Sequence, residues 1–292
     1  RHARYAKALL TRQKAVSTFI PAQESALSTH PYEAGCKWNF QMVAPDGSKP
    51  GKPQLSNFKE KPGMLQHILQ WDQAATLWIN GSQSLFLDGF FMAITQTVTW
   101  LPLIAVLLYV LIRNNDFRHI GLIVLFIGLC ILLADQMASG FCKPYFKRFR
   151  PTQDPQIMYL LDVVNDYRGG RYGFFSSHAA NTFSVAMFVT LLIRRRGLGL
   201  MLFSWAALNG WSRIYLGVHY FGDVVVGTVW GCIVGATVYW LYTRLNRQPV
   251  RLSVSNRSAF TITNYRLSDA DLLTCCFALT YLYVTFNAIC FK

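Results

Sequence analysis

Long apolar stretches are the feature that most constrains how this chain can fold. They occupy residues 86–112, 119–139, 178–193, 198–211, 224–243 and 272–289. A bilayer core about 30 Å thick needs roughly 20 helical residues, and the first, second and fifth stretches reach that length. The third and fourth are short and can be extended only into polar sequence. The pattern predicts an all-α, polytopic membrane helix bundle with about six spans.

The composition also favours a bilayer over water as the main surroundings of the chain. Charged residues make up only 14% of it, against about 25% in soluble domains. Hydrophobic residues make up 52%, which excludes disorder as the main state. The net charge of +14 could indicate nucleic-acid binding, but the interleaved apolar runs favour a membrane protein with no nucleic-acid partner.

The chain divides into four parts along its length. Residues 1–62 contain several Pro, Gly and Lys without an apolar period, and we predict a loosely structured or mobile N-terminal arm. The helix bundle is expected over 63–243, a cytoplasmic loop over 244–269, and an extra C-terminal membrane helix over 270–292.

At the start of the bundle, residues 64–79 carry apolar side chains at helical spacing. Trp71 and Trp78 suit a helix that lies at the membrane interface, where Trp is enriched. A buried helix packed on the bundle is an equally favoured alternative.

Basic residues in the short connections predict the orientation. Arg113 and Arg118, Arg194–Arg196, and the arginines between 244 and 266 follow the first, third and fifth stretches. If each stretch crosses once, these connections share one side, predicted to be the cytoplasm. The opposite side receives residues 140–175, which are also basic. Basic residues are expected in the cytoplasm, so this segment is an exception, which is explained if its cations bind a substrate.

The first of three polar clusters runs from Cys142 to Pro151. Lys143 and Arg150 are seven residues apart, nearly two helical turns, so both can point the same way. Arg presents a planar fork that matches phosphate oxygens, and Lys presents a compact positive charge. Taken alone, the cluster favours a solvated basic loop near anionic lipid headgroups.

The second cluster runs from Gly173 to His178. Ser176 or Ser177 is predicted to cap a helix whose N-terminus would attract an anion. His178 stands where it could pass a proton to a leaving group. Taken alone, a capping turn with a structural histidine is favoured.

The third cluster runs from Ser212 to Asp223. If His219 begins a helix, Asp223 lies one turn later and can reach back to it. A carboxylate on one ring nitrogen fixes the tautomer and leaves the other nitrogen free as a nucleophile. A His–Asp pair that only satisfies itself is the plain alternative. A metal site is disfavoured among so many cations.

Considered together, the clusters favour a function. Two short stretches separate them, so antiparallel helices would return all three to one membrane face. Lys143, Arg150, Arg213 and the Ser176–Ser177 turn would then surround two histidines and one aspartate. That arrangement is a pocket for a phosphoryl group. Asp135, inside the second stretch, is expected to be a structural hydrogen-bond partner.

The order and spacing of these residues resemble the three-part signature of the type 2 phosphatidic acid phosphatase superfamily, in its membrane lipid phosphatase branch. The matching positions are Lys143-x6-Arg150-Pro151, Ser176-Ser177-His178 and Ser212-Arg213-x5-His219-x3-Asp223. The resemblance covers about residues 64–243. Ser177 stands where the family usually has Gly, and Phe221 where Pro is frequent, but neither change removes a charge.

The resemblance implies a role for each matched residue. His219 would be the nucleophile that forms a phosphohistidine, Asp223 would orient it, and His178 would be the general acid that later activates water. The implied phosphate-binding residues are Lys143, Arg150, Ser176, Ser177 and Arg213. No metal or other cofactor is implied.

The sequence therefore predicts an integral-membrane, metal-independent phosphatase that hydrolyses a lipid phosphate or diphosphate. An isoprenoid diphosphate, a lipid A phosphate, phosphatidylglycerophosphate and phosphatidate all fit. The site is expected to face the extracytoplasmic side of the inner or plasma membrane. A lipid phosphotransferase using the same phosphohistidine is one alternative, and an inactive membrane scaffold or permease is another. The sequence makes no prediction of the oligomeric state.

Overall fold

The computed structural model describes residues 63–246, apart from 81 and 83, and residues 259–290. The predicted N-terminal arm, 1–62, and part of the predicted loop lie outside the described residues. Within them the chain is helical, with two isolated β-bridges and no strand. The helices are α2 (Met64–Asn80), α3 (Leu85–Thr95), α4 (Leu101–Asn114), α5 (Phe117–Asp135), α6 (Lys143–Phe146), α7 (Ser177–Ile193), α8 (Arg196–Tyr215), α9 (Phe221–Leu245) and α10 (Leu267–Ile289).

Four helical segments of the described chain are long and apolar enough to cross a membrane. They are Thr97–Asn114, Phe117–Phe146, Phe221–Leu245 and Leu267–Ile289. Helix α7 is apolar but has 17 residues, and it packs between α5, α8 and α9. A helix enclosed by others contacts less lipid, so it tolerates the polar residues that lie near its start. The predicted membrane helix bundle is confirmed.

The sequence suggested one continuous helix over the first apolar stretch, but the structure has two helices there. Helix α3 ends at Thr95, and Gln96 is extended before a 3₁₀ turn leads into α4. Two side chains donate to backbone carbonyls at the end of α3. Thr99 Oγ1 donates to Ala93 O at 2.7 Å, and Trp100 Nε1 donates to Ile94 O at 2.9 Å. These bonds let a helix end inside apolar sequence without leaving carbonyls unpaired.

The fourth stretch forms a longer helix than its apolar residues suggested. Helix α8 continues to Tyr215, so Ser212 and Arg213 lie in its last turn instead of following it. Ser212 Oγ donates to Asn209 O at 2.7 Å, which satisfies the hydroxyl inside the helix. Both side chains are buried, and the helix carries Arg213 directly to one end of the bundle.

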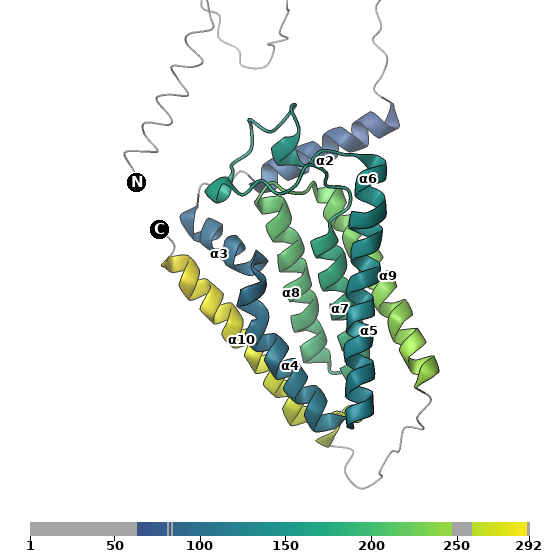
Figure 1. The fold of residues 1–292 in the computed structure, drawn as a ribbon. Coiled ribbons are helices and arrows are strands. Elements are labelled where there is room, and N and C mark those ends of the chain that lie inside the picture. The colour runs from purple at the N-terminus through teal and green to yellow at the C-terminus, as the bar shows by residue number, and fades with distance from the viewer. Residues whose placement is uncertain (1–62, 81, 83, 247–258, 291–292) are drawn as a thin grey trace, which may run out of the picture. The chain divides into compact units, whose positions relative to one another are not determined.

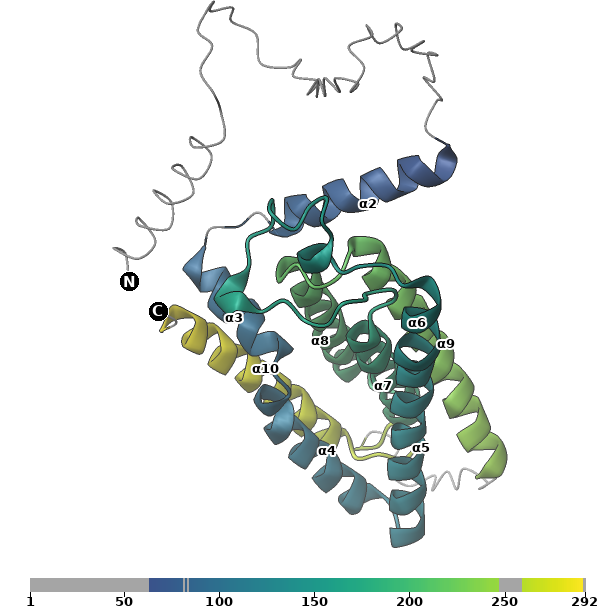
Figure 2. The same cartoon turned by 45° about the horizontal axis from the view of Figure 1, so that its top comes forward.

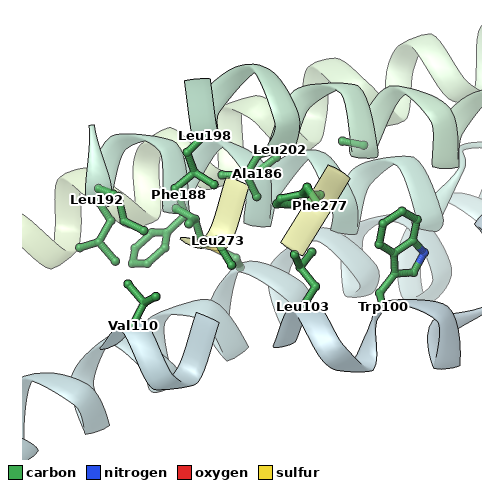
Figure 3. Close-up of a cluster of buried hydrophobic side chains, with 14 of the residues drawn as sticks. Trp100, Leu103, Val110, Ala186, Phe188, Leu192, Leu198, Leu202, Leu273 and Phe277 are labelled. Atoms are coloured by element: carbon green, nitrogen blue, oxygen red, sulfur yellow. The ribbon is translucent and has the colours of Figure 1, made fainter. Parts of the chain in front are cut away.

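Large side chains from four helices fill the middle of the bundle. Val110 of α4, Phe188 of α7, Leu198 of α8 and Leu273 of α10 lie together in Figure 3 and belong to one buried cluster. Aliphatic and aromatic packing of this kind fixes helix positions without polar contacts. Helix α10 runs along α3 and α4 (Figure 1), which completes one side of the bundle.

Helices α7 and α9 pack by a different means, through a stripe of glycines. Gly227, Gly231 and Gly235 face the backbone carbonyls of Ser176, Ala180 and Ser184. A Cβ placed on Gly227 would lie 2.6 Å from Ser176 O. Small residues four apart allow this close approach of two helices in a membrane. The stripe therefore sets the distance between the two helix N-termini.

Helix α2 lies across one end of the bundle, over α8 and α9 (Figures 1 and 2). Its Thr76 and Asn80 are buried, whereas Trp71 and Trp78 are exposed. Asn80 Nδ2 donates to Tyr215 O at 2.6 Å, which ties the helix to the end of α8. Helix α2 therefore packs on the bundle with one face and leaves an aromatic face free.

The basic connections gather at the opposite end, where α4, α7 and α9 finish (Figure 1). There Arg195 pairs with Asp271 at 3.1 Å. Thr263 Oγ1 donates to Ile193 O at 3.0 Å, which joins the turn before α10 to the end of α7. The described parts of the three basic connections thus lie on one side of the bundle.

Candidate active site

The three polar clusters meet at the end of the bundle covered by α2, which we call the site end. Lys143 Nζ donates to Ser177 Oγ at 3.1 Å, joining the first cluster to the second. Ser176 N donates to Asp223 O at 3.0 Å, joining the second to the third. All eight predicted site residues therefore lie on elements that are connected at this end.

The first cluster reaches the site by a turn and not by the single helix face that its spacing suggested. Helix α6 ends at Phe146, and Lys147 adopts a left-handed conformation with φ of 46°. Arg150 follows in extended backbone. Its Nε donates to Tyr172 O at 3.1 Å, and its backbone N–H donates to Arg171 O at 3.1 Å. These bonds fix the guanidinium at the site.

Lys143 ends a chain of polar contacts that begins inside α5. Its Nζ donates to Ser139 Oγ at 3.0 Å, and Ser139 Oγ donates to Asp135 Oδ1 at 3.0 Å. Ser139 lies in a π-helical segment, Gln136–Cys142, between α5 and α6. Such segments are frequent at functional sites because they re-aim side chains. Asp135 is thus a structural partner that connects to the site through Ser139.

The second cluster forms the start of α7. Ser176 is the N-cap, and its side chain accepts a hydrogen bond from Ala179 N at 3.4 Å. The remaining N–H groups of the first turn give this end a partial positive charge. His178 lies in the same turn with an exposed side chain, and it is close enough to Arg213 and His219 to interact electrostatically with both.

Arg213 points into the site from the end of α8 and is 2% exposed. Its Nη2 donates to Tyr167 OH at 2.9 Å, and its Nη1 donates to Thr95 Oγ1. Its Nε is buried and has no hydrogen-bond partner among the described residues. The guanidinium is thereby held in place, with its Nε–H and one N–H of each terminal nitrogen left for further acceptors.

His219 is wholly buried and lies in the turn between α8 and α9. The turn passes through Gly217, whose φ of 68° is a conformation that glycine adopts without strain. The sequence analysis considered a helix that begins at His219. In the structure α9 begins two residues later, at Phe221, with Tyr220 as its N-cap. Asp223 still reaches back, and its Oδ2 lies 3.4 Å from His219 Nδ1.

The surroundings of His219 favour its neutral form. Burial lowers the pKa of the ring well below its usual value, and the positive charges of Arg150, Arg213 and Lys143 lower it further. Neither ring nitrogen makes a hydrogen bond of regular geometry among the described residues, and the backbone carbonyl of Gly173 lies near the ring. A neutral imidazole with a free nitrogen among fixed cations can attack an electrophile that carries negative charge.

Sequence reasoning missed two residues of this network. Arg148 Nη1 donates to Asp223 Oδ1 at 2.9 Å, and Arg148 Nη2 donates to Asp72 Oδ2 at 2.6 Å. Arg148 lies inside the first cluster, two residues before Arg150, so its position in the sequence could have indicated that it lies at the site. Asp72 is an acidic residue on a helix with exposed Trp, which gave no such signal.

The chain is similar in sequence to proteins of a known family. Residues 120–247 match the family model described as the PAP2 superfamily. A lipid A 4′-phosphatase of Bacteroides thetaiotaomicron is 38% identical over 183 residues, which cover 62% of this chain and 81% of that protein. The chain belongs to the PAP2 superfamily. A lipid A 4′-phosphatase of Porphyromonas gingivalis is 37% identical over 178 residues, 61% of this chain and 75% of that protein.

Two solved structures are also similar. A transmembrane phosphatidylglycerolphosphate phosphatase from Bacillus subtilis has a TM-score of 0.47 and 21% identity, covering 64% of this chain and 89% of that one. LpxE from Aquifex aeolicus has a TM-score of 0.42 and 25% identity, covering 56% of this chain and 92% of that one. Family membership confirms the predicted enzyme class, a phosphatase, in a multi-pass membrane protein.

Proposed function

We propose that this PAP2 phosphatase removes a phosphate from a lipid A type of glycolipid through a phosphohistidine on His219. Two relatives above 35% identity, each covered over at least three quarters of its length, carry the name lipid A 4′-phosphatase. The observation that carries the mechanism is the buried His219 ring beside Asp223. Among the predicted lipid substrates, this similarity favours lipid A over the other three.

The first step transfers the phosphoryl group to the enzyme. Because Asp223 Oδ2 lies beside Nδ1, the nucleophile is Nε2. A bond forms between Nε2 and phosphorus while the bond from phosphorus to the sugar oxygen breaks. Desolvation and the nearby cations lower the pKa of His178, so it is the negative charge of the bound phosphate that favours a proton on this ring. His178 gives that proton to the sugar oxygen, which leaves as an alcohol. Asp223 stabilises the positive charge that develops on the His219 ring.

The second step returns the enzyme to its starting state. His178, now without its proton, takes one from a water molecule whose oxygen attacks phosphorus. The bond to Nε2 breaks, and inorganic phosphate is released. In both steps, charge on the phosphoryl oxygens is met by Lys143, Arg150, Arg213 and the N-terminal turn of α7. Fixed donors of this kind supply most of the catalysis in phosphoryl transfer.

We further propose that the site faces the extracytoplasmic side of the membrane. The supporting observation is that the arginine-rich connections gather at the end opposite to the site end, as the Arg195–Asp271 contact illustrates. Basic connections are retained in the cytoplasm. A single cysteine placed in the site-end loop and labelled with an impermeant thiol reagent on intact cells tests this; labelling only after lysis would contradict it.

The activity itself is tested with the purified full-length protein in detergent. Phosphate release is measured from lipid A, phosphatidylglycerophosphate, phosphatidate and undecaprenyl diphosphate, with and without EDTA. We expect lipid A to be the best substrate, with release in the absence of any acceptor lipid and unaffected by EDTA. Release that requires an acceptor lipid would indicate a phosphotransferase instead. Release from none of the four, or loss of activity with EDTA, would contradict the proposal.

A further inference from the structure

Arg148 lies between two carboxylates that come from distant parts of the chain. One end of its guanidinium donates to Asp223 and the other to Asp72, which is 76 residues away in sequence. Its plane also covers the ring of Tyr220 at 4.0 Å from the ring centre. Tyr220 OH in turn donates to Asp154 Oδ2 at 2.6 Å. The guanidinium is therefore held along both edges and across one face.

The contact with Asp223 determines how that carboxylate can point. Asp223 is wholly buried. Its Oδ1 accepts from Arg148, whereas its Oδ2 accepts from Tyr220 N at 3.2 Å and faces His219 Nδ1. With one oxygen held on each side, the carboxylate cannot rotate away from the imidazole. A buried carboxylate without such a partner is strongly destabilised.

Asp72 extends this restraint to helix α2. Its Oδ2 accepts from Arg148, and its Oδ1 accepts from Gly222 N at 2.6 Å. Thr76 Oγ1, one turn later, accepts from Phe221 N at 3.1 Å. These N–H groups belong to the first turn of α9. They have no acceptor within the helix, so they need acceptors from outside it. Helix α2 thus holds both Arg148 and the start of the helix that carries Asp223.

We propose that Arg148 and Asp72 are positioning residues for the nucleophile. They orient the Asp223 carboxylate toward His219 and so raise the rate of phosphohistidine formation, without contacting the substrate. This inference rests on the proposed function of His219. It also means that α2, the helix with the exposed Trp71 and Trp78, is coupled to the catalytic pair by direct hydrogen bonds.

The contacts distinguish Arg148 from the cations that would hold phosphate. Both terminal nitrogens of Arg148 are occupied by carboxylates. Arg213, by contrast, keeps a buried Nε with no partner among the described residues. Loss of a substrate-binding cation weakens binding as well as lowering the chemical rate, whereas loss of a positioning residue lowers the chemical rate with binding unchanged. The two roles therefore predict different kinetic changes.

The test is steady-state kinetics of full-length variants in detergent on the best lipid of the panel. For Arg148→Met we expect kcat to fall about 100-fold, the scale of a small misplacement of reacting groups, with KM within about twofold. Arg148→Lys should recover part of kcat, because an ammonium can still reach Asp223. Asp72→Asn should lower kcat less than Arg148→Met, since its amide oxygen can still accept from Gly222 N.

Arg244→Met is the matched control. Arg244 also stacks on an aromatic ring, 5.2 Å from the centre of Trp240, but it lies at the far end of α9. We expect wild-type kcat and KM from it. If Arg148→Met fails to fold, as judged by gel filtration and thermal unfolding, Arg148→Lys and Asp72→Asn carry the test in the same way.

Two results would overturn the inference: a kcat for these variants equal to that of Arg244→Met, or a rise in KM with kcat unchanged. His219→Ala, assayed beside them, separates this failure from that of the proposed function. If His219→Ala is inactive while Arg148→Met is fully active, only the positioning role is wrong. If His219→Ala keeps its activity, the proposed mechanism is wrong.

Discussion

The two ends of the bundle both carry arginine–aspartate pairs, but the pairs differ in burial and in what they hold. At the site end, Arg148 is 23% exposed and joins Asp72 and Asp223, which are 10% and 0% exposed. At the opposite end, Arg195 and Asp271 are 41% and 52% exposed. A solvated pair contributes little to stability, whereas breaking a buried one leaves a charge without compensation.

The difference shows where charge is fixed in this protein. The site end combines cations from a loop and from two helix ends in positions set by hydrogen bonds. The opposite end keeps its arginines at the surface, where they suit solvent or lipid headgroups. Similar residue types therefore have different expected effects when they are changed, and these differences can be measured.

The largest effect is expected from the cations at the site. Arg150→Ala and Arg213→Ala should each lower turnover by about 10²–10³-fold or more, because a preorganised donor to the phosphoryl oxygens is lost. Phosphate release from the best lipid substrate measures this. Turnover close to wild type in either variant would show that the residue does not bind the phosphoryl group.

The next effect concerns the glycine stripe that brings α7 and α9 together. Gly231→Ala would place a Cβ against Ala180 O, and overpacking of this kind costs about 1–3 kcal/mol. We expect a lower unfolding temperature and reduced activity, because the starts of α7 and α9 would separate. Gly128→Ala on α5 is the control, since nothing lies within 4 Å of its Cβ position. Equal stability of the two variants would show that close contact is not required.

The pKa of His219 allows the effect of a site-end arginine to be compared with that of an arginine at the opposite end of the bundle. Burial and neighbouring cations hold its pKa well below the usual value of about 6.5, so the ring should be neutral at neutral pH and lose reactivity only in acid. Histidine-labelled protein studied by NMR, with the signal assigned by its loss in His219→Ala, measures the pKa. Arg150→Ala should raise this pKa, and Arg195→Met should leave it unchanged. A wild-type pKa of 6.5 or above would contradict the described electrostatics.

The smallest effect is expected at the opposite end. Arg195→Met breaks a solvated pair, so stability should change by at most about 1 kcal/mol and turnover should be unchanged. Thermal unfolding in detergent and phosphate release check both. A large loss of activity would show that the arginine-rich end contributes to the site.

Much of the site's arrangement could be predicted because it follows from chain direction. Short antiparallel stretches return the chain to one side, so Lys143, His178 and His219 were expected together, and the structure places them at one end. An N-cap at Ser176 or Ser177 followed from residue type, and the structure has it at Ser176. The lengths of α7 and α9 followed from their apolar runs.

Other features depend on contacts that no local pattern encodes. The break after Thr95 arises because Thr99 and Trp100 satisfy the end of α3 with their side chains. The turn at Lys147 replaces an expected helix, so Arg150 reaches the site by a different path. Asp72 pairs with Arg148 only because α2 lies across α9. The first contacts join residues six apart, and the last joins residues 76 apart, so neither follows from the apolar periodicity.

The central claim is that distant segments converge to make His219 a nucleophile. Rapid acid-free quenching of the enzyme with lipid labelled in its phosphate tests it most directly. We predict labelled phosphate on wild-type protein, lost in acid, located at His219, and absent from His219→Ala. Labelled phosphate trapped on His219→Ala, or found at another residue of the wild-type protein, would contradict it.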